Sequence, residues 1–148
     1  MGMLIRAARA HDAAAVDALL HQLGYPQDGP ESAAKRIESW GGDPAGAVFV
    51  AEADGDVLGV VAVHTCPFFE RPGSWGRIVA LVVADGARGQ GVGACLVAEA
   101  ESFAADRGCV RMEVTSADRR LDAHGFYRGR GYIDQAGTSS RFLRDLQG

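Results

Sequence analysis

The sequence predicts an α/β (α+β) fold in a single domain spanning residues 1–148, because strand-like and helix-like patterns alternate along the chain. The strongest strand pattern is the apolar, largely β-branched run at residues 77–83, which is typical of a buried central strand. The strongest helix pattern is residues 92–107, where apolar side chains recur at helical spacing and Gly108 ends the run. A glycine-rich turn joins the two, and the rest of the chain is interpreted around this strand, turn and helix.

Further strands are predicted where apolar and β-branched residues alternate with polar ones or form short runs. They are residues 3–8, 47–53, 57–64, 110–115 and 139–146. The second and third of these are joined by Asp54-Gly55-Asp56, which is typical of a hairpin turn.

Three further helices are predicted. The first is capped by Asp12 and ends at Gly24, with an apolar stripe along one side. The second begins at a capping-box pattern that starts at Asp28, and it runs to about Trp40. The third lies within residues 123–132 and contains two internal glycines, each of which costs about 1 kcal/mol relative to alanine. We therefore expect this last helix to depend on tertiary packing.

Composition and charge narrow the class of function. A net charge of −4 without a basic stripe argues against a nucleic-acid-binding protein. The absence of a signal-peptide pattern and of a long apolar run argues against a membrane protein. The three cysteines, Cys66, Cys95 and Cys109, form no CxxC pair and are expected to be reduced thiols, mostly in the core of a cytoplasmic protein. The histidines show no metal-ligand spacing, so no metal is expected.

The glycine-rich turn has the chemical features of a diphosphate-binding site. Glycines at a strand-to-helix junction let backbone amides approach a phosphate, and the helix N-terminus adds roughly half a positive charge. A Walker loop is excluded because Gly-Lys-Ser/Thr is missing. The dinucleotide fingerprint GxGxxA fits, but about 55 residues follow it, too few to complete a Rossmann sheet. A plain helix cap is the alternative. The residues of the turn are Arg88, Gly89, Gln90, Gly91, Val92 and Gly93.

The turn resembles the (Arg/Gln)-x-x-Gly-x-(Gly/Ala) signature of the GNAT acetyltransferase superfamily. Residues 123–132 resemble a second landmark of the same family, Ala-x-x-(Phe/Leu)-Tyr-x-x-x-Gly-(Tyr/Phe), at the family's spacing from the first. The resemblance implies a mixed, mostly antiparallel sheet of six to seven strands, flanked by about four helices and splayed between its fourth and fifth strands. It also implies acetyl-CoA as co-substrate, with the pyrophosphate on the amides of the turn and the pantetheine arm paired with Leu81, Val82 and Val83.

The resemblance further implies direct attack of a neutral amine on the thioester, which needs a base, oxyanion stabilisation and an acid for the departing thiolate. Tyr127 matches the family's tyrosine and is the predicted acid, with packing on the sheet as the alternative. Glu113 and His64, each at a strand position, are the two candidate bases. The commoner roles for such residues are a solvated carboxylate for Glu113 and a hydrogen-bonded strand end for His64. One position departs from the family pattern, because Arg120 stands where many members carry asparagine.

The predicted function is transfer of the acetyl group of acetyl-CoA to a primary amine, with a small-molecule acceptor as the leading hypothesis. Acetylation of a protein lysine or N-terminus is one alternative, and a non-catalytic acetyl-CoA sensor is another. The resemblance places the loop at residues 23–30 beside the acceptor, although a plain connector fits as well. The two phenylalanines in the loop at residues 65–74 are expected to form an apolar wall, a dimer contact or part of the core. A homodimer is left open; neither nucleic acid nor a membrane is an expected partner.

Overall fold

The computed structural model describes residues 2–115 and 121–147, and the chain divides into two compact units, Met1–Thr115 and Ser116–Gly148. In chain order, the elements of the first unit are β1 (Leu4–Ala7), η1 (Ala10–Asp12), α1 (Ala13–Leu23), α2 (Pro30–Gly41), β2 (Gly46–Ala53), β3 (Asp56–Pro67), β4 (Ser74–Val83), η2 (Asp85–Ala87), α3 (Val92–Asp106) and β5 (Cys109–Val114). No helix in the described part of the chain is long and apolar enough to cross a lipid bilayer.

The five strands form one sheet in the order β1-β2-β3-β4-β5, in which only β4 and β5 run parallel. The prediction of a mixed, mostly antiparallel sheet with about four helices is therefore confirmed, whereas the expected six to seven strands is wrong. The strand predicted at residues 139–146 is missing, because this segment has no strand partner among the described residues. Its apolar residues, Phe142, Leu143 and Leu146, do not alternate, so the two-residue period of a half-buried strand was never present.

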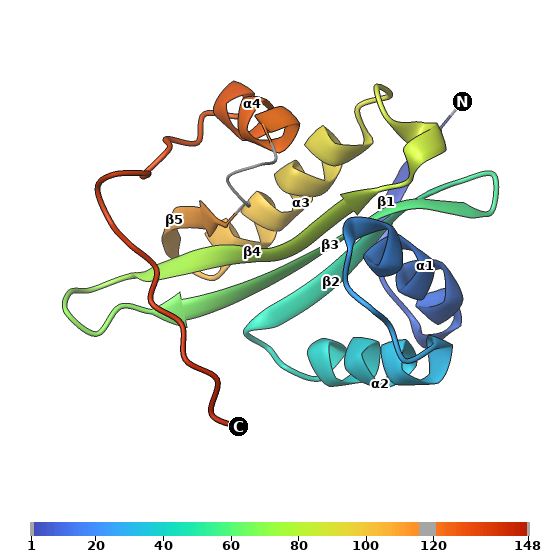
Figure 1. Cartoon of the computed structure of the whole chain (residues 1–148), viewed down its shortest axis with the longest axis horizontal. Coiled ribbons are helices and arrows are strands. Elements are labelled where there is room, and N and C mark those ends of the chain that lie inside the picture. The colour runs from blue at the N-terminus through green and yellow to red at the C-terminus, as the bar shows by residue number, and fades with distance from the viewer. Residues whose placement is uncertain (1, 116–120, 148) are drawn as a thin grey trace. The chain divides into compact units, whose positions relative to one another are not determined.

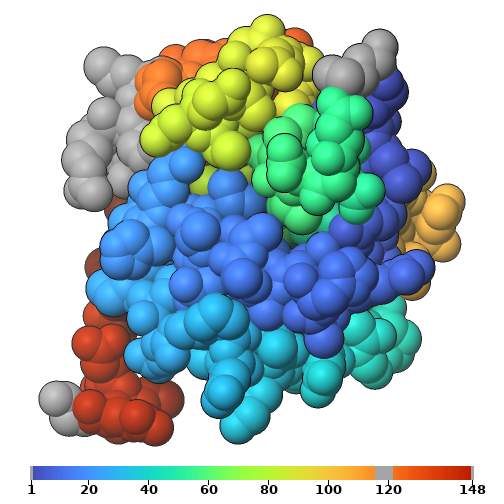
Figure 2. All heavy atoms as spheres, turned by 90° about the vertical axis from the view of Figure 1, so that its right-hand side faces the viewer, coloured from blue at the N-terminus to red at the C-terminus, as the bar shows by residue number. Residues whose placement is uncertain are grey.

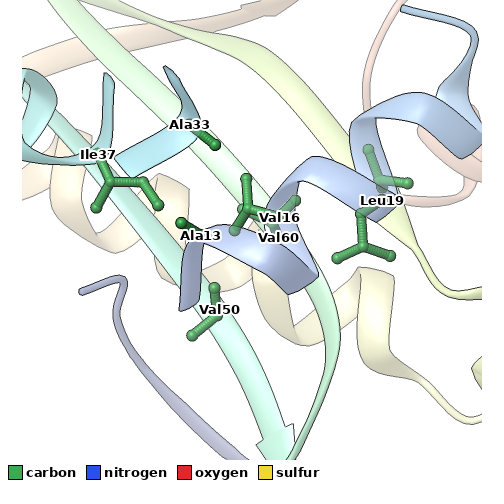
Figure 3. Packing of buried hydrophobic residues seen from close by; sticks show 8 residues of the cluster. Ala13, Val16, Leu19, Ala33, Ile37, Val50 and Val60 are labelled. Carbon is green, nitrogen blue, oxygen red and sulfur yellow. The ribbon is translucent and has the colours of Figure 1, made fainter. Parts of the chain in front are cut away.

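Two helices cover one face of the sheet and a third covers the other (Figure 1). Side chains of α1 and α2 pack on β2, β3 and β4 in the cluster of Figure 3, which consists of Ala13, Val16, Leu19, Ala33, Ile37, Val50, Val60 and Val82. On the opposite face α3 approaches so closely that a Cβ on Gly59 would lie 3.0 Å from Leu96 and 3.1 Å from Val92. Burial of each valine or leucine contributes about 1.5–3 kcal/mol, so both faces of the sheet are anchored by apolar packing.

Two local predictions need correction. Helix α2 begins at Pro30 with Gly29 as its N-cap, not with the predicted capping box at Asp28. Gly29 has a φ of +99°, a conformation that favours glycine, and Pro30 suits the first helical position, so these two residues set the start of the helix. Cys66 and Cys95 are exposed rather than buried, since Cys95 faces away from the buried side of α3.

The second unit contains α4 (Leu121–Gly129), which confirms the helix predicted within residues 123–132. Gly131 follows it with a φ of +91°, and the amide of Tyr132 donates to the carbonyl of Tyr127 at 3.1 Å. The two tyrosine rings meet edge to face with centroids 5.8 Å apart. Arg128 pairs with Asp134 at 2.8 Å. These contacts fold the chain back on the end of α4.

Arg6 joins β1, η1 and β2 through charged hydrogen bonds. Its two terminal nitrogens donate to both carboxylate oxygens of Asp12, each at 2.8 Å, and one of them also donates to Glu52 at 2.7 Å. The amide of Arg9 donates to Asp12 as well, and the Asp12 side chain is only 2% exposed. The hydrogen bonds from Arg6, more than any other contact, hold the pKa of Asp12 below its usual value.

We predict that Asp12→Asn lowers the free energy of unfolding at neutral pH by about 3 kcal/mol, because it breaks a buried ion pair. The loss should shrink in acid. A carboxyl group whose pKa is lowered by folding stabilises the protein above its unfolded pKa of about 3.9, and this contribution disappears as the pH falls through the lower folded value. Urea denaturation across this range measures the effect, with the exposed Asp56→Asn as control. Equal stability of Asp12→Asn and wild type at neutral pH would contradict the prediction.

Candidate functional site

Strand β4 separates from β5 halfway along its length. The parallel pairing runs from Ser74 and Cys109 to Ile78 and Val114 and then stops. On its other side, β4 stays paired with β3 as far as Val83. Among the described residues of this unit, the second half of β4 therefore has no strand partner on its β5 side. An unpaired strand edge of this kind can pair with an extended, amide-bearing ligand.

The alternation of the β4 backbone determines which groups reach the open edge. The amide of Ala84 donates to the carbonyl of Leu58 on β3 at 2.8 Å, so Ala84 and Val82 direct their backbone groups toward β3. Leu81 and Val83, one residue out of phase, direct theirs the other way. The sequence predicted that Leu81, Val82 and Val83 pair with the arm of the ligand. The backbone groups of Leu81 and Val83 point to the open edge, whereas those of Val82 point to β3.

Gln22 of α1 fixes the point where β4 ends. Its side-chain nitrogen donates to the carbonyl of Val83 at 2.9 Å, and its side-chain oxygen accepts from the amide of Asp85 at 3.2 Å. In Figure 2 the yellow-green atoms of the turn after β4 lie at the surface beside the blue atoms of α1. A ligand arm that used Val83 would therefore bind its amide, or replace Gln22 at its carbonyl.

The glycine turn opens directly into α3. Gly89 and Gly91 have φ values of +81° and +79°, and a Cβ added to either would meet nothing within 4 Å. Gly91 is the N-cap of α3 and brings no side chain to cap it, so the first amides of the helix remain without a partner inside the helix. Arg88 contacts Asp85 at 3.4 Å, and both side chains are exposed. Free amides, a helix N-terminus and a nearby cation fit a phosphate group.

A bulge at Val79 marks the place where β4 leaves β5. Ile78 pairs with Val63 and Ala80 with Ala62. Val63 and Ala62 are consecutive on β3, so Val79 is an extra, unpaired residue on β4. The bulge residue is 52% exposed. An extra residue leaves the ladder locally disrupted, and bulges of this kind are frequent beside active sites.

A pocket of about 370 Å³ lies on the α2 side of the sheet and reaches this bulge. Its described lining residues are Trp40 of α2, His64 and Cys66 of β3, and Trp75, Arg77 and Val79 of β4. The volume lies in the range of small-molecule sites, and the lining combines aromatic walls with a few polar groups.

His64 is held in this pocket from two sides. Its Nε2 lies 3.1 Å from an oxygen of Asp43, and its ring meets the Trp40 ring edge to face with centroids 5.7 Å apart. Asp43 also accepts a hydrogen bond from the amide of Ala45, and this bond, followed by the one to His64, lowers the pKa of Asp43. A carboxylate at one ring nitrogen fixes the imidazole so that the other nitrogen is the proton acceptor.

Glu113 lies in the same row of the sheet as His64. Arg77 is opposite His64 in the β3–β4 pairing and opposite Glu113 in the β4–β5 pairing, so the three side chains share one face. Glu113 is 3.8 Å from Arg77 and does not line the pocket. The structure thus brings the two predicted bases to one face and distinguishes their surroundings.

Tyr127 belongs to the second unit, where its ring contacts Phe126 and Tyr132. Its assignment as the acid stays a prediction. Arg120 lies outside the described residues. Within the described part of the chain, no group of three histidine, cysteine, aspartate or glutamate side chains is placed to hold a metal ion.

Arg77, Trp75 and Asp43 were not among the site residues predicted from the sequence. One signal was available for Arg77, a charge at the start of an otherwise apolar strand, which is rare unless the charge is paired or functional. Asp43 and Trp75 carried no such signal, because they reach the pocket only through strand register and the end of α2.

A half-open strand that runs into a glycine-rich helix start is an arrangement that binds phosphate-bearing ligands. A model of the acetyltransferase (GNAT) family matches residues 14–132, and the chain therefore belongs to this family.

One characterised relative is the aminoalkylphosphonate N-acetyltransferase of Salmonella typhimurium, 37% identical over 84 residues. The matched stretch covers 56% of this chain and 54% of that protein, so the chain spans about half the length of this relative. A transcriptional regulator from Bacillus halodurans has the same fold, with a TM-score of 0.84, 23% identity and coverage of 97% and 100% of the two chains. The glucosamine-6-phosphate N-acetyltransferase of Arabidopsis thaliana gives a TM-score of 0.82 at 21% identity, with coverage of 97% and 100%.

We predict that Gly91→Val weakens acetyl-CoA binding on the order of tenfold or more, because a side chain would fill the open space beside the amides. Gly108→Val is the matched control. It has the same left-handed conformation, at a φ of +78° with open space around it, but it follows the opposite end of α3. Titration calorimetry on both folded variants measures the difference. Unchanged affinity in Gly91→Val would show that the turn is not the phosphate site.

Proposed function

We propose that this protein transfers the acetyl group of acetyl-CoA to the primary amine of a small molecule. The observation that carries the proposal is the half-open edge of β4, which leads from the bulge at Val79 to the glycine turn at Gly89 and Gly91. Family membership, and the name of the Salmonella typhimurium relative, support acetyl transfer to an amine.

The residues present fit acetyl-CoA along this edge. The left-handed glycines leave space beside the free amides of α3, where a diphosphate would be bound, and Arg88 adds a positive charge. Leu81 and Val83 offer backbone groups for an amide-bearing arm. Bound acetyl-CoA supplies the reactive thioester. At the bulge, the backbone of Val79 is outside the regular ladder, so its amide is our candidate for stabilising negative charge on the acyl oxygen.

The acceptor amine would enter from the pocket on the α2 side. The pocket reaches Val79, and its volume of about 370 Å³ lies in the range of small-molecule sites. An amine arrives mostly as an ammonium ion, so a proton must be removed before attack. His64 is the better-placed base, since it lines the pocket and is oriented by Asp43. Glu113 is the second candidate, because its negative charge is already shared with Arg77.

The roles of the remaining residues are proposals as well. Tyr127 would donate a proton to the departing thiolate, as the family motif implies. A single catalytic domain, a cytoplasmic location and a homodimer stay predictions from the sequence. A protein acceptor and a non-catalytic sensor are the competing functions.

A panel of small amines incubated with acetyl-CoA, with release of free thiol as the readout, tests the function. We expect at least one amine to be acetylated, and Tyr127→Phe to bind acetyl-CoA normally but to lower kcat on the order of 10²–10⁴-fold, because only the hydroxyl is removed. Acetyl-CoA binding without thiol release for any amine would contradict a small-molecule acceptor and leave the sensor or a protein acceptor as the function. Wild-type kcat in Tyr127→Phe would leave solvent as the proton source.

The base is tested by the pH dependence of kcat/KM with the best amine. In the wild type, we expect kcat/KM to fall with an inflection as the pH is lowered. His64→Gln should lose this inflection and Glu113→Gln should keep it, because His64 lines the pocket and Glu113 does not. Asp43→Asn should reduce kcat with little change in KM, since Asp43 contacts His64 rather than the substrate. If both His64→Gln and Glu113→Gln keep the wild-type profile, the base lies elsewhere.

A further inference from the structure

Arg77 brings a permanent positive charge into the pocket beside β4. Its side chain is 41% exposed and lines the pocket together with Trp40 and Trp75. Among the described residues that form the lining, no carboxylate accompanies it. The chain as a whole carries a net charge of −4, so this positive lining is a local property and not a consequence of overall composition.

The contacts of Arg77 with other described residues use only a small part of its hydrogen-bonding capacity. One terminal nitrogen donates to the hydroxyl of Thr115 at 3.2 Å. The other lies 3.8 Å from a carboxylate oxygen of Glu113, which is too long for a hydrogen bond. A guanidinium has five N–H donors in a planar fork. Most of them are therefore available to a ligand, and such a fork matches the paired oxygens of an oxyanion.

The surroundings of Arg77 define what else the ligand must be. His64, opposite Arg77 on β3, can take a proton, while Trp40 and Trp75 provide apolar walls for a short carbon chain. Val79, at the bulge, is two residues from Arg77 on the same strand, roughly 6–7 Å away. A ligand that reaches both ends of this stretch is short.

We infer that the acceptor is an amine that also carries an oxyanion, either a phosphonate, a phosphate or a carboxylate, and that Arg77 binds the oxyanion. This inference rests on the proposed acetyl transfer. The amine would lie toward Val79, in the pocket that His64 also lines, and a linker of about two or three carbons would join it to the anion at Arg77. Arg77 thereby selects the acceptor and sets which end of it faces the thioester.

The same charge disfavours other acceptors. A polyamine or an aminoglycoside-like amine would bring several positive charges close to the Arg77 guanidinium, and like charges repel. A lysine side chain of a protein has no anion at the distance that Arg77 requires. A small amine with an uncharged tail would enter the pocket but would make no hydrogen bond to the guanidinium of Arg77.

The test uses ligands without an amine, so that binding is measured apart from acetyl transfer. Ethylphosphonate and propionate are titrated by calorimetry into the wild-type protein, Arg77→Gln, Arg77→Lys and Arg71→Gln. Arg71 is the matched control, because it stacks on Phe68 in the hairpin next to β4 and does not line the pocket. In parallel, KM is measured for 2-aminoethylphosphonate, β-alanine and propylamine with acetyl-CoA.

We expect Arg77→Gln to weaken anion binding, and to raise KM for the anionic amines, on the order of tenfold or more, with partial rescue in Arg77→Lys and no change in Arg71→Gln. KM for propylamine, which has no anion to bind at Arg77, should not rise and should fall if the charge of Arg77 repels its ammonium group. Comparison of the affinities for ethylphosphonate and propionate shows whether the site prefers a phosphonate or phosphate group or a carboxylate. Equal anion binding by wild type and Arg77→Gln, or no anion binding at all, overturns the inference. If the anions bind through Arg77 but no amine is acetylated, the oxyanion site at Arg77 is supported and the proposed acetyl transfer to a small amine is refuted.

Discussion

The antiparallel pairing of β3 with β4, interrupted once at Val79, is the constraint on which the rest of the site depends. Before the bulge, Trp75 and Arg77 face the α2 side of the sheet, and after it Val82 faces the same side. A shift of one residue reverses every side chain in a strand. Without the extra residue, either the pocket would lose Arg77 to the α3 side or the core would lose Val82. The bulge thus lets one strand serve a polar pocket at one end and an apolar core at the other.

The end of β4 is controlled from another part of the chain. Gln22 contacts both the last carbonyl of the strand, at Val83, and the amide of Asp85, so α1 determines where the strand stops and the turn begins. Helix α1 is itself anchored to β1 and β2 through Arg6 and Asp12. The position of the glycine turn therefore depends on contacts between segments more than sixty residues apart, and not on its glycines alone.

The sequence predicted those features that local patterns encode. The strand at residues 77–83, the glycine turn and the helix that follows were recognised because periodicity and backbone freedom are properties of short segments. Three features were not recognised from the sequence: the bulge, the row formed by His64, Arg77 and Glu113, and the contact of Asp43 with His64. They arise because strand register brings distant residues together, and this leaves no local signal. The absent last strand has the opposite cause: short apolar clusters satisfy a strand pattern loosely even when no partner strand accepts them.

Charge distribution links the fold to the chemistry of the pocket. Along one row of the sheet, Arg77 lies between His64, which is paired with Asp43, and Glu113. A lone cation there would oppose entry of an ammonium ion, and a lone carboxylate would hold the ammonium in its protonated form. With the cation in the lining and the carboxylates outside it, an acceptor that carries both charges can place its anion at Arg77 and its ammonium near His64. The row therefore offers a physical basis for both selecting and deprotonating such an acceptor.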